Sequence, residues 1–258
     1  MGLHPARSES STCFSTPVDY VEQMHVVVPF AADTPKTRLS GVLAPTERTT
    51  LARAMLADVL SAVVATGHVP TVLSTSPLTV ESLFSSDDQH ASVSPALESL
   101  REIPVTVDDR PLTAAVNAYL EAAEEPVAIV MADLALATPA ALSTVFDAGA
   151  ADGVAIAPGR GGGTNALVVR HPDFRVDYHG ASYVDHREHA TEIGAPLESV
   201  DSFRLGTDID EPADLVEVLI HGREDGNQSR TATRLRELGF ELETTDGRVT
   251  VVRTESDP

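Results

Sequence analysis

Short apolar runs alternate with longer segments of helical periodicity along most of this chain. Residues 25–30 are too few for a helix and rich in valine, which is typical of a buried strand. After Pro45, apolar residues recur every fourth position from Leu51 to Val63, and Gly67 follows, which predicts an amphipathic helix. With a second strand at residues 71–73, this part of the chain predicts one β-α-β unit of a parallel sheet.

The alternation continues to about residue 170. We expect strands at residues 103–107, 127–131, 154–157 and 165–169, and helices at residues 111–124 and 139–149. Residues 74–94 are polar and poorly periodic, so we expect mostly loop there. The pattern predicts an α/β fold in three layers, with an open, mainly parallel sheet and helices on both of its faces.

One domain accounts for the length of 258 residues. Residues 1–23 show no usable periodicity, and we expect a disordered extension there, with Met24 as an alternative start. The domain is expected to span residues 24–258. Its C-terminal part predicts a helix after Pro212, another at residues 229–238, and a hairpin with Asp246-Gly247 at its turn.

Acidic residues outnumber lysine and arginine by 39 to 18, which gives a formal net charge of −21. Nucleic acids and anionic membranes bind clustered cations, so neither is an expected partner. The acidic residues are spread along the chain, as in proteins whose solvated surface is adapted to high salt. One cysteine, Cys13, allows no disulfide framework, and no segment resembles a signal peptide or a spanning helix. We therefore expect a soluble protein in a reducing cytoplasm.

Lys36 is the one lysine in the chain. It lies in the loop after the first expected strand, next to Thr37 and Arg38. Open α/β sheets bind ligands at the carboxyl ends of their strands, and two cations flanking a hydroxyl suit a phosphate. Such a loop is often merely solvated. A lysine kept here by an otherwise lysine-free chain favours a phosphate-binding role, because a flexible point charge can follow a phosphoryl group as its charge shifts.

Three aspartates are candidates for a hard-cation site. Asp133 follows the expected strand at residues 127–131, and Asp208 and Asp210 precede Glu211-Pro212. Mg²⁺ takes one or two protein carboxylates and fills its other positions with water and phosphate oxygens. Asp208 and Asp210 also have a structural interpretation, because aspartate ahead of Glu-Pro is a frequent helix N-cap. Both interpretations stay open at this point.

A glycine-rich loop at residues 158–165 separates two expected strands. Its amides could close on a phosphate, or the loop could be a simple hairpin turn. It lacks the Gly-Lys-Ser or Gly-Lys-Thr ending of a P-loop and does not open a helix. A Walker-type kinase is therefore disfavoured.

Six motifs, in order along the chain, resemble the 2-phospho-L-lactate guanylyltransferases of coenzyme F420 biosynthesis. The most specific joins Val27-Val28-Pro29-Phe30 to Pro35-Lys36-Thr37-Arg38-Leu39. The others are Arg53-Ala54-Met55-Leu56-Ala57-Asp58-Val59-Leu60, Met131-Ala132-Asp133-Leu134, Gly162-Gly163-Thr164-Asn165-Ala166-Leu167, Ser182-Tyr183-Val184-Asp185-His186 and Asp208-Ile209-Asp210-Glu211-Pro212-Ala213-Asp214-Leu215. The resemblance extends from about Met24 to Ile220.

This resemblance implies a Rossmann-like nucleotidyltransferase fold. It also implies an enzyme that joins GMP from GTP to 2-phospho-L-lactate, or to phosphoenolpyruvate, with release of pyrophosphate. Mg²⁺ is the implied cofactor, and a homodimer is the implied assembly. Two other functions stay open: a nucleotidyltransferase that makes a sugar or molybdenum-cofactor nucleotide, and a module that binds GTP without turnover.

The same resemblance implies roles for individual residues. The catalytic residues would be Lys36, Arg38 and Asp133, with the two cations facing the triphosphate. The metal would be held by Asp133 and by one or both of Asp208 and Asp210. The acid substrate's pocket would be lined by Thr164, His179 and Ser182, and Gly162 and Gly163 of the glycine-rich loop are further candidate binding residues. His179 stands where glycine is commoner in the family.

Overall fold

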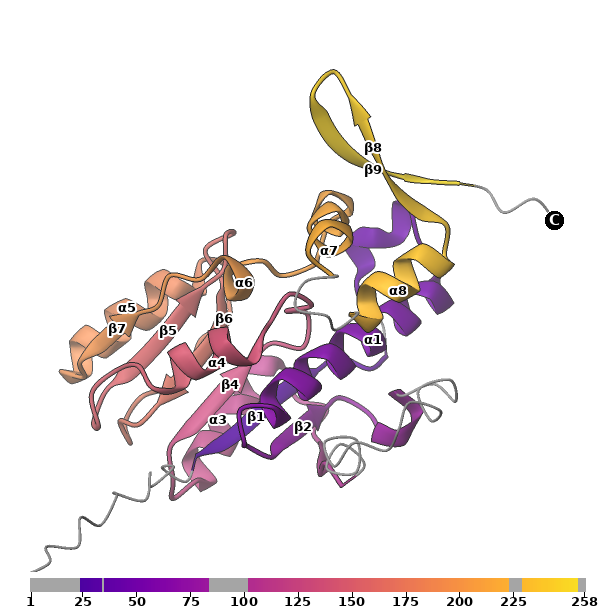
Figure 1. Ribbon diagram of the computed structural model, residues 1–258. Helices are drawn as coiled ribbons and strands as arrows, with labels where there is room; N and C mark the ends of the chain where they lie inside the picture. The colour runs from indigo at the N-terminus through magenta and orange to yellow at the C-terminus, as the bar shows by residue number, and fades with distance from the viewer. Residues whose placement is uncertain (1–23, 34, 84–101, 223–228, 255–258) are drawn as a thin grey trace, which may run out of the picture.

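A sheet of seven strands forms the centre of the part of the molecule that the computed structural model describes, residues 24–33, 35–83, 102–222 and 229–254 (Figure 1). The strands are β1 His25–Phe30, β2 Pro70–Ser74, β3 Val105–Val107, β4 Val127–Val130, β5 Val154–Pro158, β6 Thr164–Val169 and β7 Leu197–Ser199. The expected extension at residues 1–23 and residues 84–94 of the expected loop lie outside the described residues.

The strands are ordered β3-β2-β1-β4-β6-β5-β7. Strand β1 pairs in parallel with β2 and β4, with Val28 opposite Val72, which confirms the expected β-α-β unit. Strand β6 is antiparallel to both of its neighbours, whereas the remaining neighbouring pairs are parallel. Its reversal follows from the connection, because the short glycine-rich loop between β5 and β6 permits a hairpin but no crossover.

Helices cover both faces of the sheet, as the alternation predicted. The α-helices are α1 Pro45–Val64, α3 Leu112–Ala122, α4 Pro139–Phe146, α5 Ser182–Ile193, α6 Phe203–Gly206, α7 Leu215–His221 and α8 Arg230–Glu237. Successive strand residues point to opposite layers: Val26 and Val28 pack with α1 and α4, and Val27 packs with α3 and α5. Burial on both faces explains why the strands are continuous apolar runs.

Helix α1 begins and ends where the sequence predicted. Pro45 occupies its first position, and the Glu47 carboxylate accepts the Ala44 backbone N–H at 2.7 Å. The apolar residues at every fourth position, from Leu51 to Val63, are fully buried. The carboxylate of Asp58 also accepts the backbone N–H groups of Arg230 and Thr231 at the start of α8.

Three elements were absent from the sequence-based expectations: α5, β7 and α6. Helix α5 escaped notice because the three residues that it buries are Ser182, His186 and Ala190, which share one face at a spacing of four. Two of the three are polar, so no apolar periodicity marks the helix. The expected loop at residues 74–94 was also partly wrong, since Ser74 ends β2 and Val80–Leu83 forms the 3₁₀ helix η2. The helix expected at residues 139–149 ends at Phe146.

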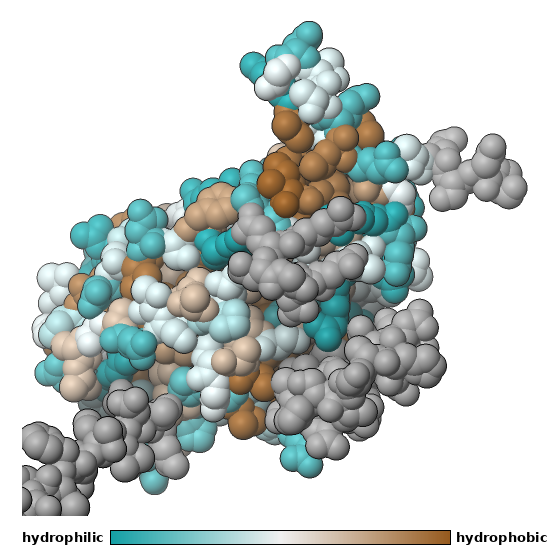
Figure 2. All heavy atoms as spheres, viewed as in Figure 1, coloured by the Kyte–Doolittle hydropathy of each residue, from teal (hydrophilic) through white to brown (hydrophobic). Residues whose placement is uncertain are grey.

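The C-terminal hairpin, β8 Phe240–Thr245 and β9 Arg248–Arg253, stands away from the body near α7 and α8 (Figure 1). Asp246 and Gly247 both have positive φ angles, 52° and 74°, as the expected tight turn requires. Apolar side chains gather where the hairpin meets the body (Figure 2). No helix among the described residues is long and apolar enough to cross a membrane.

Candidate functional site

A cleft with a volume of about 700 Å³ lies at the carboxyl edge of the sheet. Residues that follow β1, β2, β3 and β4 line it, which is the edge where ligands bind in open α/β sheets. One end carries Lys36, Asp133 and Asp210. The other end carries Asp108 and Arg110, which form an ion pair that sequence reasoning did not single out.

Lys36 is buried in this cleft between two carboxylates. Its Nζ atom lies 2.7 Å from Oδ2 of Asp133 and 2.6 Å from Oδ1 of Asp210, and its side chain is 10% exposed. Lys36 precedes the 3₁₀ helix η1, Thr37–Gly41, with a left-handed backbone at φ 56° and ψ 46°. This conformation costs a residue with a side chain about 1 kcal/mol or more.

The ammonium of Lys36 stays charged despite its burial. Loss of water alone would lower the pKa of Lys36, but the attraction of Asp133 and Asp210 and their hydrogen bonds outweigh that effect and raise the pKa. An ammonium has three hydrogens to donate, and two are directed at these carboxylates. The third can be donated to a ligand in the cleft.

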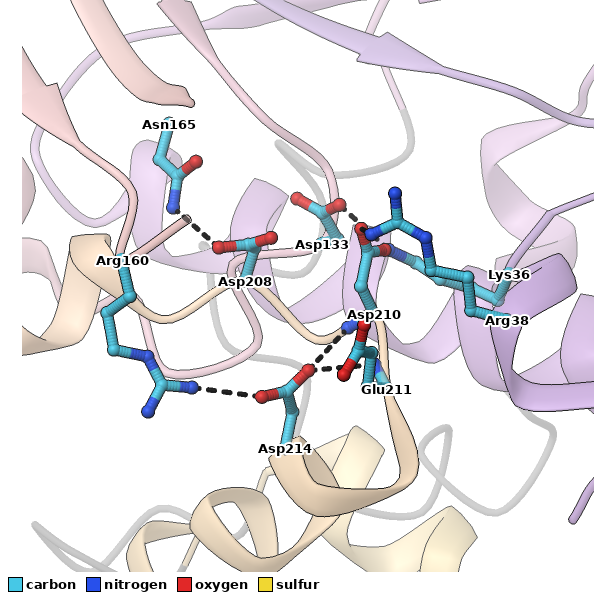
Figure 3. Close-up of polar contacts among 9 residues, drawn as sticks. All are labelled: Lys36, Arg38, Asp133, Arg160, Asn165, Asp208, Asp210, Glu211 and Asp214. Carbon is cyan, nitrogen blue, oxygen red and sulfur yellow. Dashed lines mark hydrogen bonds and ion pairs between the residues drawn. The ribbon is translucent and has the colours of Figure 1, made fainter. Parts of the chain in front are cut away.

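Arg38 flanks the same carboxylate from the solvent side. Its Nη1 atom lies 3.3 Å from Oδ2 of Asp210, and its side chain is 68% exposed. Figure 3 shows Lys36 and Arg38 converging on Asp210. The structure thus brings together Lys36, Arg38, Asp133 and Asp210, as the sequence-based hypothesis required.

Asp133 has a carboxylate oxygen that fits a cation. Its Oδ2 atom binds Lys36, but its Oδ1 atom is buried and accepts no hydrogen bond from any described residue. Its backbone carbonyl accepts the N–H of Ile209 at 3.2 Å, which fixes the segment carrying Asp208 and Asp210 beside it. In Figure 3 the carboxylates of Asp133 and Asp208 face the same space. A buried anionic oxygen without a partner is a suitable ligand for a hard cation.

Asp208 and Asp210 lie in the connection between the short helix α6 and the 3₁₀ helix η4, Pro212–Asp214. They therefore follow a helix, whereas Asp133 follows a strand of the sheet. Asp208 Oδ1 accepts a hydrogen bond from Nδ2 of Asn165 at 3.1 Å. Within the described chain, no group of three or more histidine, cysteine or acidic residues is placed to hold one ion together. Two carboxylates are therefore the most that these residues offer in this arrangement, which is enough for Mg²⁺.

The capping interpretation of Asp208 and Asp210 is wrong, because the N-cap of η4 is Glu211, which forms a capping box with Asp214. Asp214 Oδ2 accepts the backbone N–H groups of Asp210 at 3.0 Å and Glu211 at 2.8 Å. Asp214 Oδ1 also binds Arg160 of the glycine-rich loop at 2.9 Å. Sequence reasoning missed Asp214, although an acidic residue three positions after Glu211 was a capping signal. The carboxylate of Asp210 is thus available to line the cleft and bind Lys36, and that of Asp208 to accept from Asn165.

The glycine-rich loop is the turn of the β5–β6 hairpin. Gly159 donates to the carbonyl of Gly163 at 2.9 Å, and Gly162 donates to the carbonyl of Gly159 at 3.0 Å. These two amides are used by the turn itself. A Cβ atom at position 159 would lie 2.6 Å from Oδ1 of Asn165, so glycine there lets Asn165 reach Asp208. Phosphate binding by other amides of this loop remains a prediction.

The residues predicted to hold the acid substrate lie outside the lining of the cleft. Thr164 and Ser182 are buried together, with their hydroxyl oxygens 3.4 Å apart. His179 is 80% exposed and contacts Asp177, which raises the pKa of His179 by hydrogen bonding and charge. Sequence reasoning gave no role to His186, whose ring bonds Thr164. Strand β6 nevertheless connects these residues to the proposed metal ligands. Thr164 is followed in β6 by Asn165, whose side chain donates a hydrogen bond to Asp208.

Comparison with known proteins relates this chain to guanylyl transferases. The family model described as guanylyl transferase CofC-like matches residues 24–254. A 2-phospho-L-lactate guanylyltransferase from Natrialba magadii is 84% identical over 236 residues, covering 90% of this chain and 100% of that protein. Proteins with the same name from Haloterrigena turkmenica and Halorubrum lacusprofundi are 64% and 54% identical, covering 90% and 89% of this chain and 98% and 100% of their own lengths.

Solved structures share the fold at low sequence identity. A structure from Desulfovibrio desulfuricans, assigned to the nucleotide-diphospho-sugar transferases, has a TM-score of 0.62 and 16% identity, covering 83% of this chain and 94% of its own. A nucleotidyl transferase from Methanothermobacter has a TM-score of 0.54 and 19% identity, covering 77% of this chain and 96% of its own. These likenesses confirm the nucleotidyltransferase-like α/β fold.

Proposed function

This chain belongs to the family of CofC-like guanylyl transferases, and we propose that it joins GMP from GTP to 2-phospho-L-lactate with release of pyrophosphate, in coenzyme F420 biosynthesis. The observation that carries this proposal is the buried ammonium of Lys36, held by two carboxylates inside the cleft. A buried cation with one hydrogen left to donate suits a phosphate ligand better than it suits any neutral substrate.

GTP lies across the carboxyl ends of β3, β2, β1 and β4. Three strand spacings of about 4.8 Å give a site about 14 Å long, comparable with an extended nucleoside triphosphate. Lys36 and Arg38 mark the triphosphate end. Toward β2 and β3 the cleft has apolar walls that include Leu73 and Leu112, against which a purine ring can pack.

Asp133 and one of Asp208 and Asp210 hold Mg²⁺ in this proposal. The support is the buried Oδ1 atom of Asp133, which accepts no hydrogen bond from any described residue. When bound there, Mg²⁺ would supply positive charge that offsets the charge developing on the transferred phosphoryl group and on the leaving pyrophosphate. The side-chain amide of Asn165 donates a hydrogen bond to the carboxylate of Asp208 and thereby fixes its orientation.

The protein's part in the reaction is to position and to stabilise charge. An oxygen of the substrate's own phosphate attacks the α-phosphorus of GTP, and the bond from that phosphorus to the bridging oxygen of the β-phosphate breaks. No protein nucleophile is needed, and no general base, because the attacking phosphate is already ionised. Lys36 donates its free hydrogen to a phosphate oxygen. Its two carboxylate partners keep it in place while the charge moves.

Thr164, Ser182 and His179, with Gly162 and Gly163, hold the acid substrate in this proposal. The substrate carries a phosphate and a carboxylate, both of which require hydrogen-bond donors. The hydroxyl of Ser182 donates to that of Thr164 at the carboxyl edge of the sheet, where β6 begins, which leaves the hydrogen of the Thr164 hydroxyl for the acid. The start of β6 also adjoins Asp208 through Asn165, which puts the acid near the proposed metal ligands.

A substrate panel that follows pyrophosphate release tests this function. We expect release with GTP and 2-phospho-L-lactate at molar salt, little release with ATP, and none with sugar phosphates. Direct competition between 2-phospho-L-lactate and phosphoenolpyruvate then shows which acid is preferred. Turnover with a sugar phosphate or a molybdenum cofactor precursor would contradict the assignment. Tight GTP binding without any pyrophosphate release would instead indicate a non-catalytic module.

The enzyme acts as a homodimer in this proposal, with the C-terminal hairpin at the interface. Leu242 and Val249 on the hairpin and Ile220 on α7 are each more than 40% exposed. Apolar side chains also gather where the hairpin meets the body (Figure 2). Sedimentation at molar salt is expected to give the mass of two chains for the wild type and of one chain for Leu242→Glu/Val249→Glu. A wild type that sediments as a single chain would contradict the dimer.

A further inference from the structure

A buried histidine joins two parts of the region proposed to hold the acid substrate. His186 is 1% exposed on the face of α5 that packs against the sheet. Its Nε2 atom lies 2.9 Å from the backbone nitrogen of Asp177, in the segment leading to His179. Its Nδ1 atom lies 2.9 Å from the hydroxyl oxygen of Thr164, at the start of β6.

These two contacts determine where the ring carries its hydrogen. The backbone N–H of Asp177 can only donate, so Nε2 of His186 must accept and carries no hydrogen. Burial lowers the pKa of His186 to about 4, so the ring is neutral at neutral pH. Its single hydrogen is therefore on Nδ1, and Nδ1 donates to the oxygen of Thr164.

The hydroxyl of Thr164 consequently has its own hydrogen to donate elsewhere. Its oxygen accepts from Nδ1 of His186 at 2.9 Å and from the hydroxyl of Ser182 at 3.4 Å. A hydroxyl oxygen accepts two hydrogen bonds and donates one. Both acceptor positions are filled, and the hydroxyl donates to no other described residue.

We propose that His186 is a positioning residue that fixes the Thr164 hydroxyl as a hydrogen-bond donor toward an anionic oxygen of the acid substrate. The inference rests on the proposed function, in which Thr164 contacts that acid. Carboxylate and phosphate oxygens only accept, so a hydroxyl free to rotate would spend part of its time with its lone pairs toward the substrate. The ring of His186, held by the backbone N–H of Asp177, donates to Thr164 from a fixed position and removes that orientation before the substrate arrives.

Packing offers a simpler explanation for the same ring. His186 lies 5.9 Å from Phe174 and 5.4 Å from Tyr178, measured between ring centroids. A histidine that only filled this layer would affect stability, whichever of its nitrogens found a partner. The two explanations differ in whether the Nδ1 donor matters for the acid substrate.

Two matched variants separate the explanations. In His186→Asn the side-chain amide can replace Nδ1 as a donor to Thr164, whereas in His186→Gln it can replace Nε2 as a partner for Asp177. We expect His186→Gln to raise the KM for 2-phospho-L-lactate about tenfold or more, with the KM for GTP unchanged. His186→Asn is expected to stay within about threefold of wild type. Equal effects of both variants, or equal changes in both KM values, would overturn the proposal.

A double-variant cycle tests whether His186 acts through Thr164. Thr164→Val removes the hydroxyl at nearly constant volume and is expected to raise the same KM. Adding His186→Gln to Thr164→Val should then raise it no further, because the donor that His186 orients is gone. If the two substitutions instead raised the KM by independent factors that multiply, His186 would not act through Thr164.

The hydrogen position can be measured without activity or substitution. Nitrogen-15 NMR of the histidine-labelled wild type at neutral pH should show the hydrogen of His186 on Nδ1. A hydrogen on Nε2 would overturn the proposal. This measurement does not depend on whether any variant folds. A wild type that releases no pyrophosphate with 2-phospho-L-lactate would contradict the proposed function, and with it the role of His186. If His186→Gln keeps wild-type turnover and an unchanged KM for 2-phospho-L-lactate, only the role of His186 is contradicted, and the proposed function stands.

Discussion

Replacing Lys36 with alanine is expected to lower turnover by about 100-fold or more, as the loss of a preorganised charge contact typically does. The ammonium is fixed by Asp133 and Asp210 at 2.7 and 2.6 Å, so it needs no reorganisation when a phosphate arrives. Its removal also leaves those two carboxylates without their shared cation. Pyrophosphate release at saturating GTP and acid measures the effect, and circular dichroism reports whether the fold is retained.

Arg38→Ala is the matched control for Lys36→Ala. It removes the same charge from the same loop, but the Arg38 side chain is 68% exposed and binds Asp210 at the longer distance of 3.3 Å. Water screens an exposed cation, so we expect a distinctly smaller loss of turnover. Wild-type turnover in Lys36→Ala, or equal losses in the two variants, would contradict the special role of the buried lysine.

Asp133→Asn is expected to abolish Mg²⁺-dependent pyrophosphate release. The change keeps the shape of the side chain but removes the charge that binds Lys36 and the anionic character of the buried Oδ1 atom. An amide is a weaker ligand for a hard cation than a carboxylate, and it offers Lys36 no charge. The measurement is release as a function of Mg²⁺ concentration, with the melting temperature recorded beside it.

Two comparisons sharpen the Asp133 experiment. Asp173→Asn makes the same chemical change at an exposed position outside the cleft and should leave both activity and melting temperature near wild type. Asp208→Asn tests whether this carboxylate, held by Asn165, shares the metal with Asp133. A lower melting temperature of Asp133→Asn with full Mg²⁺-dependent activity would show that Asp133 is only structural.

The sequence determined the layers of the fold because its apolar periodicity is strong. The run at residues 25–30 became β1, and the repeat from Leu51 to Val63 became the buried face of α1. Composition also singled out Lys36, since a chain with one lysine makes its position conspicuous. Helix α5 could not be found in this way, because it turns Ser182 and His186 toward the sheet. Polar residues on a buried face remove the signal that periodicity provides.

Tertiary structure alone decided which residues meet. Lys36 bonds Asp133 and Asp210 across 97 and 174 positions of the chain, distances over which no local pattern operates. The strand order brings the loops after β1 and β4 side by side, and the Ile209 N–H bond to Asp133 brings the later segment to them. The helix η4 is capped by Glu211 and its capping-box partner Asp214, and not by Asp208 or Asp210. Periodicity records which faces of an element are buried, whereas partners are fixed by packing between elements distant in sequence.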